Sequence, residues 1–256
     1  MRIDAWINRK IGELFRSRGI EPFDSRRFYG RDGLFTYHND RFRHKAPFTA
    51  AYQRAIDASA GFDPQFEWRI HIALWAARLA LRVPGDFVEC GVNAGFVSSA
   101  LMKSLNWNSL GRSFYLVDTF AGPPLDQYSP DEIATGARTK AEQAIASGGY
   151  VTDLDRIRSN FAEWPTARVT PGRVPDVLGA VAATQVAFLH VDMNSAAPEQ
   201  ATLEHFWPKI PVGGVVLFDD YCHGNCELQT IALDETAGRL GAEIVSLPTG
   251  QGILIR

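Results

Sequence analysis

The segment from Gly85 to Val97 constrains the fold of this 256-residue chain more than any other. A short apolar run ends in an acid, and the spacing Glu89-x-Gly91-x-x-x-Gly95 leads into apolar residues at helical spacing. This order predicts a strand, a tight glycine turn and the start of a helix, which is the arrangement of a nucleotide-type cofactor site. Glycines allow the backbone to turn sharply and to approach a ligand where a Cβ would collide.

The ligand that this turn suits differs from a dinucleotide, because the spacing G-x-G-x-x-G is absent. Glu89, at the end of the predicted strand, faces the crevice and precedes the glycines. An acid in that place suits a ligand with positive charge, such as the sulfonium and ammonium groups of S-adenosylmethionine. The alternative is a glycine turn of a parallel sheet that binds no ligand.

Composition excludes several classes of partner. Hydrophobic residues make up 46% of the chain and charged residues 21%, which is enough apolar surface for a packed core. The net charge of −3 and the scattered Lys and Arg predict neither a nucleic-acid nor a membrane partner. Residues 1–18 lack the apolar core of a signal peptide, and three cysteines argue against a disulfide framework. We therefore expect a cytoplasmic protein.

After Gly85 the chain alternates strand and helix patterns, which predicts a parallel sheet buried on both faces. A terminal hairpin, 243–247 and 253–256, follows this alternation. The whole predicts an α/β, Rossmann-like class I methyltransferase fold: a mostly parallel seven-stranded sheet with a C-terminal β-hairpin and an N-terminal helical extension. The predicted parallel strands are 86–90, 113–118, 166–170, 185–191 and 214–219, and the helices are 94–105, 130–146, 152–162, 196–207 and 226–240.

The N-terminal part departs from that alternation. Residues 2–17 have the apolar spacing of an amphipathic helix, and two further helices are predicted at 47–58 and 65–81. Residues 19–43 are irregular and predict a loop or arm that covers the active-site mouth or a subunit contact. We therefore divide the chain into an N-terminal extension, 1–82, serving as lid or oligomer arm, and a catalytic domain, 83–256, and we expect a homo-oligomer.

Acidic residues follow three of the predicted strands. Asp118 ends one strand, where an acid can accept hydrogen bonds from both ribose hydroxyls of a nucleoside; a turn cap is the alternative. Asp192, Asp219 and Asp220 follow two strands that should be neighbours, so their carboxylates should converge. Three close carboxylates repel unless a cation neutralises them, and oxygen ligands suit Mg²⁺, Ca²⁺ or Mn²⁺. The alternative is a helix cap beside a solvated acid.

Two histidines and two cysteines lie near these acids in the sequence, and each has a structural as well as a functional interpretation. His190 lies two positions before Asp192 on the same face of a buried strand, so it is either a base or a satisfied core residue. His223 is a weaker candidate for a base or a substrate contact. Cys222 and Cys226 lack a second pair at zinc spacing, which favours packing roles.

Three motifs together resemble the macrocin O-methyltransferase family: residues 85–95, 115–122 and 213–221. That family comprises metal-dependent enzymes that use S-adenosylmethionine to methylate sugar hydroxyls of natural products. The resemblance implies that Asp192 is the general base, with His190 as the alternative. It implies a divalent metal held by Asp192, Asp219 and Asp220, and a cofactor site made by Glu89, Gly91, Asn93, Gly95 and Asp118.

The chain also departs from the family pattern. Asn194 stands where the family commonly has the second acid of Asp-x-Asp, and residues 195–199 replace a common Tyr-Glu-Ser-Thr run. The expected function is S-adenosylmethionine-dependent, Mg²⁺-assisted O-methylation of a sugar hydroxyl on a small molecule. A catechol or phenol methyltransferase, with an acceptor pocket from Phe35, Tyr37 and Phe42, is one alternative. A nicotinamide oxidoreductase and a non-catalytic binding protein on the same scaffold are the others.

Overall fold

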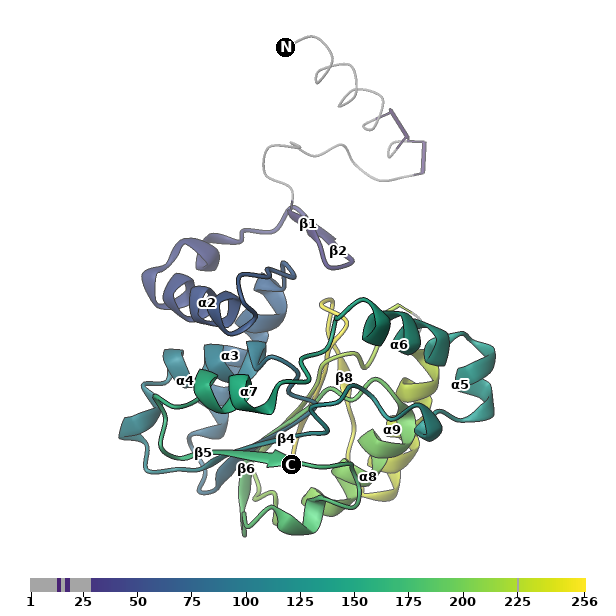
Figure 1. Cartoon of the computed structure of the whole chain (residues 1–256). Helices are drawn as coiled ribbons and strands as arrows, with labels where there is room; N and C mark the ends of the chain where they lie inside the picture. Colours follow the sequence, from purple (N-terminus) through teal and green to yellow (C-terminus); the bar gives the residue numbers. More distant parts are fainter. Residues whose placement is uncertain (1–12, 15–16, 19–28, 225) are drawn as a thin grey trace.

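A twisted seven-stranded sheet forms the centre of the protein. The computed structural model describes residues 13–14, 17–18, 29–224 and 226–256. The strands of this sheet are β3 (Asp86–Cys90), β4 (Phe114–Asp118), β5 (Ala167–Pro171), β6 (Val186–Val191), β7 (Val215–Phe218), β8 (Val245–Ser246) and β9 (Gly252–Ile255). Their order is β5-β4-β3-β6-β7-β9-β8, with β3 to β7 parallel and β9 antiparallel to both of its neighbours (Figure 1). The predicted class I methyltransferase fold is confirmed.

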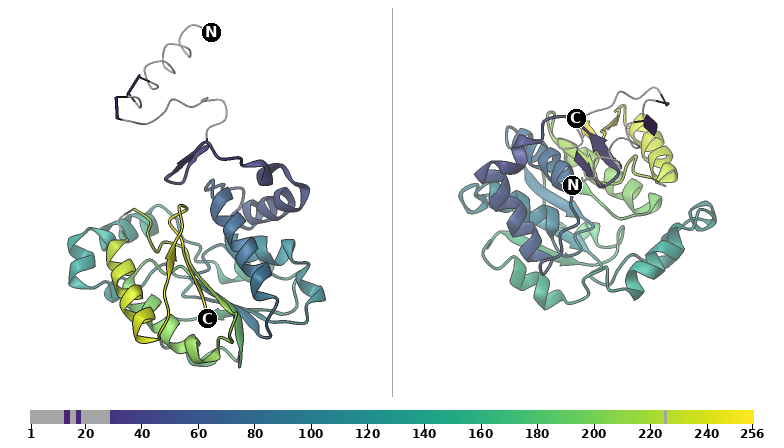
Figure 2. Two further views of the ribbon diagram at one scale, coloured as in Figure 1. Left: turned by 180° about the vertical axis from the view of Figure 1, so that it is seen from behind. Right: turned by 90° about the horizontal axis from the view of Figure 1, so that it is seen from above.

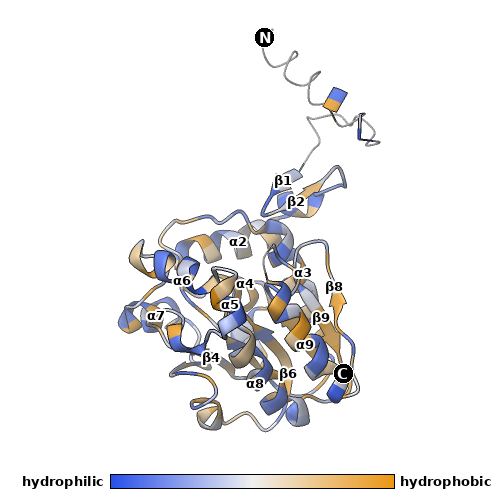
Figure 3. Ribbon diagram, turned by 90° about the vertical axis from the view of Figure 1, so that its right-hand side faces the viewer, coloured by the Kyte–Doolittle hydropathy of each residue, from blue (hydrophilic) through white to orange (hydrophobic). Residues whose placement is uncertain are grey.

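Helices cover both faces of the sheet (Figure 2). They are α2 (Ala46–Ala58), α3 (Glu67–Ala80), α4 (Phe96–Ser104), α5 (Pro130–Ala134), α6 (Ala137–Ala146), α7 (Leu154–Asn160), α8 (Ala196–Phe206) and α9 (Glu227–Arg239). Successive strand residues point to opposite faces, so Phe87 packs in the core under α2, α3 and α4, and Val88 packs in the core under α8 and α9. Apolar residues are accordingly concentrated in the central strands (Figure 3).

The predicted parallel strands agree with β3 to β7 within one residue at each end. One predicted helix is wrong in extent, because 130–146 is divided into α5 and α6. Gly136 lies between them with φ +83°, a left-handed conformation that an α-helix does not continue through.

The segment 19–43 is more regular than the sequence suggested. Within its described part, β1 (Tyr29–Arg31) and β2 (Leu34–Thr36) form an antiparallel hairpin. Its turn consists of Asp32 and Gly33, both at positive φ. The predicted helix at 2–17 lies almost wholly outside the described residues.

The helices before β3 share a core with the sheet. Phe48 of α2 and Leu74 of α3 belong to the same buried cluster as Phe87 and Phe188 of the sheet. A division of the chain at residue 82 stays a prediction. Over the described ranges, no helix is long and apolar enough to cross a membrane.

Candidate active site

The carboxyl ends of β3 and β6 meet at the switch point of the sheet, where open α/β folds bind ligands. Gly91, directly after β3, has φ +89°, and a Cβ there would lie 1.6 Å from the carbonyl oxygen of Asp192. The amide of Asp192 in turn donates to the carbonyl of Cys90 at 2.8 Å. A glycine is therefore required at position 91, because the backbone after β3 is in contact there with the backbone of Asp192 after β6.

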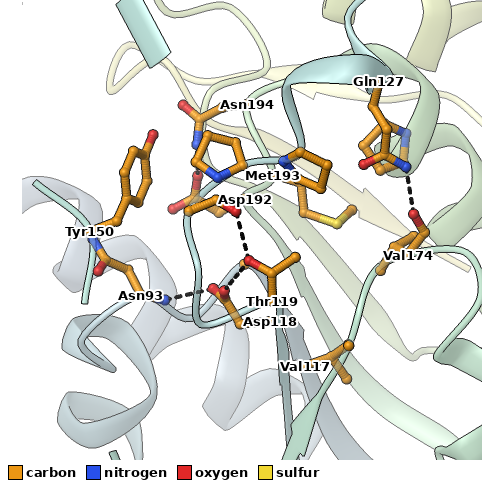
Figure 4. Close-up of a pocket in the computed structure, with 16 residues that line it drawn as sticks. Asn93, Val117, Asp118, Thr119, Gln127, Tyr150, Val174, Asp192, Met193 and Asn194 are labelled. Atoms are coloured by element: carbon orange, nitrogen blue, oxygen red, sulfur yellow. Dashed lines mark hydrogen bonds between the residues drawn. The ribbon is translucent and has the colours of Figure 1, made fainter. Parts of the chain in front are cut away.

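Asp118, at the end of β4, fixes the glycine turn. Its Oδ2 accepts from the backbone amides of Val92 at 2.7 Å and Asn93 at 2.9 Å, and its Oδ1 accepts from Phe120 at 2.7 Å. The Asn93 side chain also binds the backbone of the 149–151 segment through both of its polar atoms. The Asp118 carboxylate thus orders the loop beside the cavity (Figure 4).

A cavity opens above this turn, and four of the predicted residues line it: Gly91, Asn93, Asp118 and Asp192. Its walls also include Thr119, Tyr150 and Met193 (Figure 4). The arrangement brings acidic groups and apolar surface together, as a site for a cationic nucleoside requires.

The other two predicted cofactor residues lie away from the cavity wall. Gly95 begins α4 with φ +83°, and a Cβ there would come within 2.4 Å of the Phe161 ring. The left-handed conformation at the start of α4 and the packing against Phe161 explain why residue 95 is a glycine. Glu89 is buried in the sheet, where its Oε1 lies 3.0 Å from Nδ1 of His190 on the neighbouring strand.

His190 is unsuited to act as a base. Burial alone would lower the pKa of His190, but two carboxylates, Asp219 at 3.7 Å from Nε2 and Glu89 at 3.0 Å from Nδ1, outweigh it and raise that pKa to about 10. The ring is therefore protonated at neutral pH and has no lone pair to accept a proton. The structure favours its role as a buried cation between two carboxylates over the catalytic role predicted as an alternative.

Asp192 has the properties of a base. Burial, followed by the charges of Asp219 and Asp220, raises the pKa of Asp192 well above its usual value. The positive charges of His190 and Arg69 lower it only in part. A carboxylate with a raised pKa accepts a proton more readily at neutral pH, and this one faces the cavity (Figure 4).

A buried arginine holds the acid pair that follows β7. Arg69, near the start of α3, donates from Nη1 to Oδ2 of Asp219 at 2.7 Å and to Oδ1 of Asp220 at 2.8 Å. Its Nε donates to Oδ2 of Asp32, in the hairpin turn, at 2.6 Å. Burial opposes ionisation of Asp219, but Arg69 and His190 outweigh it and hold the pKa of that carboxyl below its usual range.

The predicted set of metal ligands does not fit a divalent ion in this arrangement. Mg²⁺ needs oxygen lone pairs directed at one point about 2.0–2.1 Å away. The two oxygens of Asp219 already accept from Arg69 and from Nε2 of Gln251, and Asp220 also accepts from Arg69. Among the described residues, no group of three or more His, Cys, Asp or Glu side chains is arranged to hold a metal. We therefore derive no step through a metal ion.

A second cavity adjoins the first, since Tyr150 and Asn194 line both. Its wall combines apolar surface from Ala137, Ala141 and Ala144 with polar groups, among them Asp220, Lys140 and Gln229. The aromatic residues predicted for a phenol acceptor do not line it: Phe35 and Tyr37 are exposed, and Phe42 is buried against Phe48, Trp68 and His71.

Sequence reasoning missed Arg69, Asp32 and Tyr150. Arg69 carried the clearest signal, because it is a basic residue in the first turn of a largely apolar helix and a cluster of acids elsewhere requires a counter-charge. The 150 positions between Arg69 and Asp219 left no local pattern that joins them. Asp32 and Tyr150 lie in short irregular segments without a distinguishing pattern.

Residues 74–237 match the macrocin-O-methyltransferase (TylF) family, over more than half of the chain. The chain belongs to this family. It is therefore an enzyme of the O-methyltransferase class, as the three sequence motifs implied.

Two characterised relatives align with large parts of the chain. The 8-demethyl-8-(2,3-dimethoxy-alpha-L-rhamnosyl)-tetracenomycin-C 4'-O-methyltransferase of Streptomyces olivaceus is 28% identical, over 70% of this chain and 68% of that protein. The mycinamicin III 3''-O-methyltransferase of Micromonospora griseorubida is 26% identical, over 56% of this chain and 58% of that protein. Among solved structures, the O-methyltransferase NovP superposes with a TM-score of 0.60 at 24% identity, over 73% of this chain and 79% of that one.

Proposed function

We propose that this enzyme transfers the methyl group of S-adenosylmethionine to a hydroxyl of a sugar carried by a small molecule. The observation that carries the proposal is the position of Asp192, a carboxylate with a raised pKa in the wall of a cavity that adjoins a second cavity. One cavity would hold the cofactor and the other the acceptor. Asp192 lies in the wall of the first cavity and accepts a hydrogen bond from Asn194, which lines both.

The cofactor would lie against the glycine turn. Asp118 faces the cavity beside the backbone amides that it orders, where the ribose of the cofactor would lie. Val117 and Met193 offer apolar surface for an adenine ring. When bound, S-adenosylmethionine supplies an electrophilic methyl group. The predicted contacts of the cofactor with Glu89 and Gly95 stay predictions, because neither residue lines the cavity.

Asp192 would act on the acceptor hydroxyl. As the hydroxyl oxygen bonds to the methyl carbon and the carbon–sulfur bond breaks, the proton passes from the hydroxyl to the carboxylate. A carboxylate with a raised pKa is a stronger base, which favours this transfer. Holding the oxygen in line with the methyl group contributes roughly 7–11 kcal/mol to lowering the barrier.

A sugar acceptor is favoured over a phenol for two reasons. The relative from Streptomyces olivaceus is named for O-methylation of a rhamnosyl-tetracenomycin, a glycosylated small molecule. The second cavity presents hydrogen-bonding groups, among them Thr135, Lys140 and Gln229, where a sugar needs partners for several hydroxyls. The Mg²⁺ ion predicted from the sequence is not part of this proposal, because Arg69 already binds two of its three predicted ligands.

A two-stage experiment tests the proposal. Isothermal calorimetry of the full chain should detect micromolar binding of S-adenosylhomocysteine and none of NAD. Methyl transfer from labelled S-adenosylmethionine is then measured on glycosylated acceptors and on catechol. We expect label only in the glycosylated compounds; absence of cofactor binding rejects the methyltransferase, and label in catechol alone rejects the sugar.

A further inference from the structure

Two side chains set the charge balance at the acid cluster. Arg69, a residue that is 3% exposed, places a guanidinium against Asp219 and Asp220. Asn194, two positions after Asp192, supplies a neutral amide that donates to Oδ1 of Asp192. The cluster thus contains a permanent positive charge, and the side chain beside Asp192 is uncharged.

The contacts of Arg69 match those that a bridging cation would make. Its Nη1 alone binds one oxygen of each neighbouring carboxylate and also the carbonyl oxygen of Asp219 at 3.1 Å. Three carboxylates surround the one guanidinium, since Asp32 binds its Nε. A guanidinium stays charged at any pH the protein meets, so its neutralising effect is constant.

Asp192 then differs from the other acids of the cluster. No ion pair of Asp192 with Arg69 is formed within the described structure, and its Oδ1 accepts only a long bond, 3.3 Å, from Asn194. The guanidinium therefore fixes Asp219 and Asp220 but leaves Asp192 available to the cavity.

We propose that Arg69 occupies the place of a divalent ion in this enzyme, as a positioning residue that bridges Asp219, Asp220 and Asp32, so that methyl transfer proceeds without a metal. The inference rests on the proposed function. It also explains why the β1–β2 hairpin is joined to the site: the same guanidinium that neutralises the acid pair binds Asp32 in the hairpin turn.

Binding of Mn²⁺ alone, followed by electron paramagnetic resonance, tests this without any assay of activity. The metal-stripped wild type should bind no Mn²⁺ at this cluster. In Arg69→Met the acid pair loses its partner, and in Arg69→Met combined with Asn194→Asp a further acid is added. Both variants should bind Mn²⁺ at least about tenfold more tightly than the wild type, because unpaired carboxylates bind such ions. Arg78→Met, at an exposed arginine of the same helix, should behave as the wild type does.

The rate of methyl transfer provides the second measurement. The wild-type rate should be equal in EDTA and in excess Mg²⁺, and Arg69→Lys should retain more activity than Arg69→Met. Stoichiometric Mn²⁺ binding by the wild type, or loss of its rate in EDTA, overturns the inference. So does a folded double variant that binds no more Mn²⁺ than the wild type. Binding of S-adenosylhomocysteine, measured in parallel, shows separately whether the proposed function itself fails.

Discussion

Asp192 combines access to the cavity with a raised pKa, and its neighbours show why. His190 in β6 and Asp219 after β7 form a buried pair with opposite charges, whereas no ion pair of Asp192 with a cation is found among the described residues. The residue that can accept a proton is thus the carboxylate whose negative charge is not paired with a neighbouring positive charge.

Replacing this carboxylate tests its role. Asp192→Asn should lower kcat by about 10²–10⁴-fold, the usual contribution of a general base. The amide keeps the size of the side chain, so the dissociation constant of S-adenosylhomocysteine should change little in calorimetry. A variant with wild-type kcat would mean that another group takes the proton.

Glu199 gives a pH dependence of stability that can be predicted with its sign. Burial raises the pKa of Glu199 from 4.5 to about 8, against the lowering effect of hydrogen bonds from Met193 and Gln229. Between those values the folded protein keeps a proton that the unfolded chain has lost, so the free energy of unfolding falls as pH rises.

The Glu199→Gln variant removes this titration. Its melting temperature relative to the wild type should rise between about pH 5 and about pH 8.5 and level off above that window. Thermal unfolding followed by circular dichroism at matched ionic strength measures the difference. A difference that stays constant with pH would show that Glu199 ionises normally in the folded protein.

At the scale of single elements, two glycines with the same φ angle allow the cost of backbone strain to be distinguished from the cost of steric overlap. Gly95 and Gly136 both have φ +83°, but a Cβ at Gly95 meets the Phe161 ring, whereas a Cβ at Gly136 meets nothing within 4 Å. The strain of the left-handed conformation is therefore common to both positions.

Gly95→Ala should consequently lower the free energy of unfolding more than Gly136→Ala does. We expect the difference to be about 1–3 kcal/mol, the usual cost of overpacking. Urea denaturation of both variants measures it, and Phe161→Leu in the Gly95→Ala background should recover part of the loss. Equal costs for the two alanines would mean that the Phe161 ring moves aside freely.

For the whole molecule, the sequence predicted the positions of the parallel strands and the presence of the terminal hairpin correctly, because both follow from local patterns. The glycine spacing and the apolar runs placed β3 to β7, and the terminal hairpin marked β8 and β9. The features that could not be predicted depend on contacts between residues far apart in the sequence. They are the pairing of Arg69 with Asp219, the burial of Glu89 against His190, and the packing of Gly95 against Phe161. The short strands of the β1–β2 hairpin lack an alternation long enough to detect.

The shared core predicts how the molecule unfolds. Because α3 packs in one cluster with the sheet, we expect Leu74→Ala in α3 to shift the unfolding of the entire chain, at a cost of about 2–5 kcal/mol. Tryptophan fluorescence and circular dichroism should give one coincident urea transition in both proteins. Two separated transitions would instead support an independent unit before residue 83.

The hydrogen bonds from Val92 and Asn93 to Asp118 have a further consequence for the rate at which the cofactor binds. These two amides belong to a loop, yet both donate to a carboxylate in the absence of ligand, so their exchange with solvent deuterium should be slow. A loop already held in this way loses little chain entropy when it is occupied. The association rate of the cofactor should therefore be set by diffusion into the cavity, with no slow ordering step of the loop.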